Sequence, residues 1–100
     1  GKDDSNNTYV SDLKYNKKIF RGLHFEEPTI LFNVKGRHYV EAMFYSPYVA
    51  YGFIPDSQQY MTCKVRGFKM ALFPSTQPIP RFLQADPDVR ILKDTLKGFD

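Results

Sequence analysis

Three side chains in the sequence combine nucleophilic or basic character with an affinity for soft metals: His24, His38 and Cys63. A structural zinc site uses closely spaced pairs of ligands, and no two of these residues are that close in sequence. A cysteine becomes an activated thiolate only in an electropositive pocket, which no sequence pattern here indicates. We therefore expect no metal site, and we interpret Cys63 as a small buried hydrophobe within a strand.

The carboxylates also lack an arrangement for acid–base chemistry. Glu26 and Glu27 are adjacent in a predicted turn, Glu41 lies in a predicted strand, and Asp56 lies in another turn. Two convergent carboxylates would form only by an accident of folding. The glycines are isolated, so no phosphate-binding loop is present. The sequence thus predicts a protein that is not an enzyme and needs no cofactor.

Aromatic and basic side chains are the remaining candidates for a site. The chain has nine Phe and seven Tyr in 100 residues. Exposed rings can stack on sugars or nucleobases, and neighbouring cations can bind carboxylate or phosphate. The alternative is that a second layer covers the rings and makes them part of the core. The predicted ligand-binding residues are Tyr39, Tyr45, Tyr51, Arg37, Lys64 and Arg66.

The charge is modestly positive, with a net value of +3. From Ser57 through Arg81 the chain carries four cations and no acid, and a second basic cluster lies at residues 14–21. Such clusters favour nucleic acid, anionic polysaccharide or acidic lipid as partners. Lysines that discourage edge-to-edge pairing of strands are the alternative explanation.

Alternating apolar residues predict strands at 18–25, 30–34, 37–45, 48–54, 60–66 and 68–72. A tight turn at Lys35 and Gly36 would join two of them as a β-hairpin, and Gly67 would form a bulge. The expected fold class is therefore mainly β, a small antiparallel β-barrel or sandwich of five to six strands with one C-terminal helix.

The C-terminal helix is predicted from Asp86 onward. Asp86 can cap it, Pro87 suits its first turn, and Val89, Leu92 and Leu96 form one apolar stripe. The prolines between residues 74 and 80 predict an extended loop before it. Residues 1–12 are polar and are expected to form a flexible leader, so residues 13–100 form the single β-rich domain.

Part of that leader, Lys2-Asp3-Asp4-Ser5, resembles the surface-export tag of Bacteroidetes-type lipoproteins, with Gly1 where that family has its lipidated cysteine. The resemblance covers four or five residues and carries no fold information. It implies an outer-membrane lipoprotein of the bacterial cell envelope, facing the periplasm or the cell surface. No apolar run reaches the roughly 20 residues of a membrane-spanning helix, so the membrane would be contacted only through a lipid anchor outside this chain.

The expected function is a non-catalytic envelope module that binds a glycan or a partner protein. The alternative is an OB-like domain that binds single-stranded nucleic acid with a steep salt dependence. A third class, an enzyme using Cys63, is testable with a thiol-reactive probe.

Overall fold

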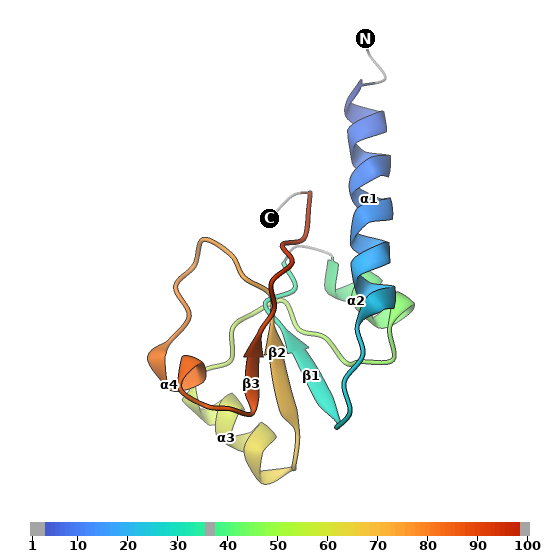
Figure 1. Ribbon diagram of the computed structural model, residues 1–100. Helices are drawn as coiled ribbons and strands as arrows, with labels where there is room; N and C mark the ends of the chain where they lie inside the picture. Colours follow the sequence, from blue (N-terminus) through green and yellow to red (C-terminus); the bar gives the residue numbers. More distant parts are fainter. Residues whose placement is uncertain (1–3, 36–37, 99–100) are drawn as a thin grey trace.

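The computed structural model describes residues 4–35 and 38–98, and within them the chain forms an α/β fold around a parallel sheet (Figure 1). The sheet has the order β1-β2-β3, with both pairs parallel. The described elements, in chain order, are α1 (Asp4–Gly22), β1 (Thr29–Phe32), α2 (His38–Tyr45), α3 (Ser57–Val65), β2 (Lys69–Leu72), α4 (Arg81–Gln84) and β3 (Val89–Ile91).

The strands form a parallel sheet because β1 and β2 are apolar along nearly their whole length, which suits burial on both faces. Leu31 and Ala71 point to one face, where they pack with Phe20 of α1 and Ala42 of α2. The alternate strand residues point to the other face. There Phe32, Met70 and Leu72 pack with Cys63 of α3 and Leu83 of α4. The sheet thus separates two apolar cores.

Residues 49–53, here called the edge segment, continue the sheet beyond β1. The amide of Leu31 donates to the carbonyl of Val49 at 2.9 Å, and the amide of Tyr51 donates to the carbonyl of Leu31 at 2.9 Å. The amide of Asn33 donates to the carbonyl of Phe53, and the edge segment runs parallel to β1. The edge segment therefore lies beside β1 on the side opposite to β2.

Both ends of α3 are closed by specific caps. The side chain of Asp56 accepts from the amide of Gln59, and the side chain of Gln59 accepts from the amide of Asp56, which forms a capping box. At the other end Gly67 has φ of +80°. The amide of Gly67 donates to the carbonyl of Lys64, and the amide of Phe68 donates to the carbonyl of Cys63. These two bonds form a Schellman motif.

A buried amide joins α1 to the C-terminal segment. The Asn16 side chain is fully buried, donates to the carbonyl of Lys97 at 2.6 Å and accepts from the amide of Lys97 at 2.8 Å. Both polar groups of the amide are thereby satisfied. This pair holds residues 92–98 against the face that α1 covers.

The mainly β expectation is wrong: the described residues hold no antiparallel pair, and the barrel or sandwich is replaced by helices on a small parallel sheet. The predicted strands at 30–34 and 68–72 are confirmed as β1 and β2. Of the other predicted strands, residues 38–45 form α2, residues 60–65 lie in α3, and residues 18–22 belong to α1. Of the predicted hairpin turn at Lys35 and Gly36, Gly36 lies outside the described residues, and the chain after it enters α2 and not a second strand.

The predicted C-terminal helix is also wrong, because its capping residue makes a different local bond. The Asp86 carboxylate accepts from the amide of Asp88 at 2.8 Å, forming an Asx turn that leads into β3. Of the expected leader, residues 4–12 lie in α1, so the boundary expected after residue 12 falls within a helix. Residues 1–3 lie outside the described part.

Gly67→Ala should lower the free energy of unfolding by about 1–2 kcal/mol, because an L residue is strained at positive φ. No atom lies within 4 Å of a Cβ placed at this position, so the alanine side chain causes no clash. The decrease in the free energy of unfolding therefore measures the backbone strain alone. Gly22→Ala is the matched control: its site is equally open and helical, so the change should be neutral or stabilising. Urea denaturation of both variants is the measurement, and equal stabilities would contradict the Schellman assignment.

Candidate functional site

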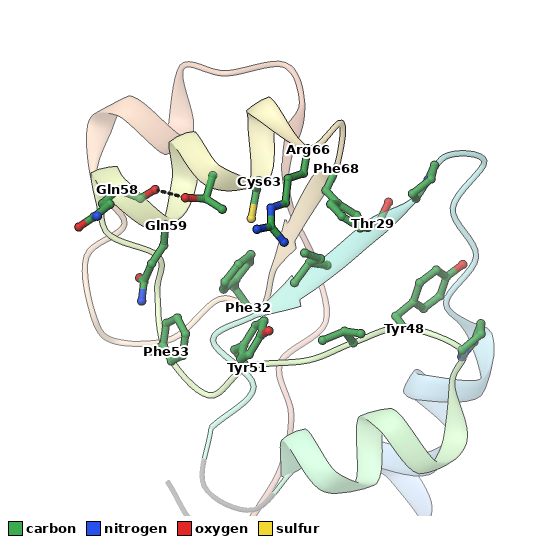
Figure 2. Close-up of a pocket in the computed structure, with 15 residues that line it drawn as sticks. Thr29, Phe32, Tyr48, Tyr51, Phe53, Gln58, Gln59, Cys63, Arg66 and Phe68 are labelled. Atoms are coloured by element: carbon green, nitrogen blue, oxygen red, sulfur yellow. Dashed lines mark hydrogen bonds between the residues drawn. The ribbon is translucent and has the colours of Figure 1, made fainter.

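A groove of about 840 Å³ lies between α3 and the sheet surface formed by β1 and the edge segment (Figure 2). Ile30 and Phe32 form its floor, because the alternation of β1 directs them to the α3 face. Helix α3 packs over β2 and α4 over β3, which leaves the β1 end of this face open. The groove is therefore a part of the sheet face that no described helix covers.

An aromatic surface lines the open side of the groove. The rings of Phe32 and Tyr51 are stacked with centroids 5.6 Å apart and planes at 27°, and Tyr51 and Phe53 lie 5.2 Å apart. Phe32 is buried, whereas Tyr51 and Phe53 remain 41% and 42% exposed. The buried ring thus supports two rings that a ligand can reach.

Polar groups come from α3. Because the Oε1 of Gln59 accepts from the amide of Asp56, its Nε2 is left as the available donor. Figure 2 shows the Gln59 side chain directed from α3 toward Phe53. The capping box therefore both starts the helix and orients a hydrogen-bond donor beside the aromatic surface.

Arg66 is the one charged residue among the described residues that line the groove. It is the C-cap of α3, and Figure 2 shows its guanidinium directed toward Phe32. No described carboxylate forms an ion pair with it. A cation without a counterion in an otherwise uncharged groove favours a ligand with an acceptor at that point.

Cys63 lines the same groove but is only 7% exposed. Burial raises the pKa of its thiol, and the charge of Arg66 offsets this only in part. The expectation that Cys63 is buried is confirmed, although it lies in a helix and not in a strand. The described residues contain no group of three His, Cys, Asp or Glu side chains that could hold a metal ion.

Two lysines that the sequence placed in a basic run are paired with acids at the amino ends of β2 and β3. Lys64 lies 2.8 Å from Asp86 and 2.7 Å from Asp88, and Lys69 pairs with Asp88 and, at 3.1 Å, with Glu27. Tyr60 donates a hydrogen bond to Asp86. Their hydrogen bonds to the carboxylates raise the pKa of both lysines, and the bond from Lys64 lowers the pKa of Asp86 to about 2. This group, the ion-pair cluster, joins α3 to the turn before β3.

The structure brings together two of the six predicted binding residues, Tyr51 and Arg66. Lys64 belongs to the ion-pair cluster, and Arg37 lies outside the described residues. Tyr45 lies under Lys17 and Arg21 of α1, which approach its ring centre at 5.0 and 5.4 Å.

Tyr39 is 40% exposed on α2 and is not among the groove residues. Sequence reasoning missed Gln59 and Phe32 as site residues. The pattern Asp56-x-x-Gln59, typical of a capping box, could have indicated Gln59.

A smaller cavity of about 130 Å³ lies at the carboxyl ends of β1 and β2, where open parallel sheets often bind ligands. Asn33 there has φ of +60° and donates to the carbonyl of Phe73 at 2.8 Å and to Ser75 at 3.1 Å. Gly98 lies against the ring of His38, so the chain itself fills part of this region. Of these two, the groove beside α3 is the larger and more accessible candidate.

No protein-family model matches the chain, and no curated protein or solved structure matches it. Among the described helices, none is both long enough and apolar enough to cross a membrane.

Asp86→Asn should reduce the loss of stability in acid. Because the folded-state pKa of Asp86 lies near 2, below its ordinary value of 3.8, the ionised carboxylate stabilises the fold above about pH 4. That contribution is lost as the pH falls from 4 toward 2. Urea denaturation across this range should show a smaller decrease for the variant than for the wild type, and equal decreases would contradict the assignment.

Cys63 should react with a thiol-reactive probe at pH 7 at least tenfold more slowly in the folded protein than in urea. Its burial both limits access and disfavours the thiolate that reacts. The measurement is the rate at which Cys63 reacts with an aromatic disulfide that releases a coloured thiolate. Faster labelling in the folded protein would instead indicate an activated thiolate and a catalytic role.

Proposed function

We propose that this chain is a non-catalytic binding module that takes a glycan in the groove beside α3. The observation that carries the proposal is the exposed pair of rings, Tyr51 and Phe53, supported by Phe32 and facing the oriented donor of Gln59. A sugar ring has an apolar face that packs on an aromatic ring and hydroxyl groups at its edge that need hydrogen-bond partners. The groove supplies both kinds of contact within one concave surface.

The size of the groove favours a discrete ligand. A volume of about 840 Å³ lies within the range of roughly 300–1,000 Å³ that is typical of ligand sites. Its lining is mainly apolar with a few polar groups, a composition that fixes a ligand's orientation. A partner protein, the other partner expected from the sequence, would have to insert a side chain or a short peptide to use this space.

Single-stranded nucleic acid is less well supported. Its backbone requires a track of cations beside the stacking rings, and the described part of the chain lines the groove with one cation, Arg66. Lys64 and Lys69 are neutralised by the ion-pair cluster. Lys17 and Arg21 of α1 lie over Tyr45, which is not among the groove residues. The OB-like barrel on which this alternative rested is absent from the described fold.

The absence of a catalytic role remains part of the proposal. It is supported by the raised pKa of the Cys63 thiol and by the lack of a carboxylate among the groove residues that the structure describes. A glycosidase requires two convergent carboxyl groups at the bound sugar. The groove is accordingly proposed to hold a sugar without cleaving it.

A location at the bacterial envelope is proposed from the resemblance of residues 2–5 to a surface-export tag. Lys2 and Asp3 lie outside the described residues, while Asp4 and Ser5 begin α1. Labelling of the full-length gene product with an alkyne fatty acid, combined with protease treatment of intact cells, tests the location. An unlabelled, protected protein would overturn the location and leave the groove proposal standing.

Tyr51→Leu should weaken glycan binding about tenfold, or ~1.4 kcal/mol, because it removes the stacking ring. Tyr51→Phe retains the ring and should bind within about threefold of the wild type. Phe44→Ala, which alters an 80% exposed ring on α2, is the off-site control.

The measurement is affinity electrophoresis through gels that contain soluble neutral or acidic polysaccharides, followed by calorimetry with the best oligosaccharide. Thermal unfolding checks that each variant is folded. If no polysaccharide retards the protein, or if Tyr51→Leu and Phe44→Ala behave alike, the proposed function is wrong.

A further inference from the structure

The charge of the groove specifies its ligand beyond the class of glycan. The described residues of the lining include one cation, Arg66, and no carboxylate. The nearest other cation on α3, Lys64, is held by Asp86 and Asp88 in the ion-pair cluster. The two basic residues of this helix end are therefore in different electrostatic situations: one is neutralised within the fold, and the other is not.

The position of Arg66 is determined by the backbone and not by an ion pair. It is the C-cap of α3, its amide donates to the carbonyl of Thr62, and the Schellman motif at Gly67 and Phe68 follows it. The backbone thus holds this end of the helix at the groove. No described group accepts a hydrogen bond from the guanidinium, so its N–H donors are available to a ligand. Because the side chain is exposed, it can meet an anion without the cost of prior burial.

We propose that the bound glycan is acidic and that Arg66 pairs with an anionic group on it while Tyr51 stacks on the sugar ring. This inference rests on the proposed function. A carboxylate offers two oxygens in the geometry that a guanidinium fork matches, and a sulfate ester offers the same. The donor of Gln59 lies on the other side of the rings, beside Phe53, so a sugar on Tyr51 is contacted by a donor at each end.

The test compares ligands that differ only in charge. An oligogalacturonate and its full methyl ester share the same rings, and the ester lacks the negative charges. Binding of both is measured by calorimetry at about 50 mM and 200 mM salt, and dextran sulfate is compared with dextran in the same way. The protein variants are Arg66→Gln, Arg66→Lys and, as a matched loss of one exposed cation elsewhere, Arg81→Gln on α4.

We expect the wild type to bind the free acid at least tenfold more tightly than the ester. Arg66→Gln should abolish that difference and leave the affinity for the ester within twofold. Arg66→Lys should retain part of the preference, since it keeps the charge and loses the fork. Arg81→Gln should match the wild type. If dextran sulfate shows the same dependence on Arg66 and binds more tightly, the anion is a sulfate.

Equal affinity of the wild type for acid and ester, with both weakened by Tyr51→Leu, would overturn the acidic preference and leave the proposed function intact. If Arg81→Gln lowers the affinity for the free acid as much as Arg66→Gln does, the acidic preference at Arg66 is also overturned. Attraction to the protein's net positive charge would then explain the binding of the acid. Absence of binding to every sugar would overturn the proposed function as well. A labelled oligothymidylate that binds more tightly than all sugars, through Arg66, would replace glycan by nucleic acid.

Discussion

Strand β1 is paired along both of its edges, and this pairing fixes the sheet, the two apolar cores and the groove. On one edge it pairs with β2, with Ile30 opposite Met70, and on the other its amides and carbonyls are satisfied by the edge segment. Its side chains alternate between the two apolar cores. A register shift of one residue would exchange the two faces, placing Leu31 in the groove and Phe32 under α1. The register that places the strand side chains in the two cores therefore also places Phe32 at the floor of the groove.

The groove follows from the dimensions of helices and strands. A helix is about 10 Å wide and strands are about 4.8 Å apart, so one helix covers about two strands. On the α3 face, α3 packs over β2 and α4 over β3. The edge segment and part of β1 thus lie beyond the reach of either helix. Tyr51 and Phe53 remain exposed because the described chain supplies no third helix on that face.

The two central strands were predictable, because runs such as Ile30-Leu31-Phe32 are apolar whichever way the neighbouring strands run. Helix α3 was not, since Met61, Cys63 and Val65 alternate like a strand although Met61 is 54% and Val65 81% exposed. The Asp56-x-x-Gln59 cap and the glycine after the helix were the better indicators. Asp86 shows the converse: a residue that can cap a helix can equally make an Asx turn. Tyr51 and Arg66 were predictable by residue type, whereas their proximity depended on the fold.

The separation of charges within α3 explains how a short helix can serve both stability and recognition. Lys64 and Arg66 are two residues apart and so point to different sides of the helix. Lys64 meets acids on the turn before β3, where an unpaired Asp86, with only 8% of its side chain exposed, would be costly. Arg66 faces a surface without acids. Charge that stabilises the fold is thus kept out of the groove, and the remaining cation is available to a ligand without weakening the contacts that hold α3 in place.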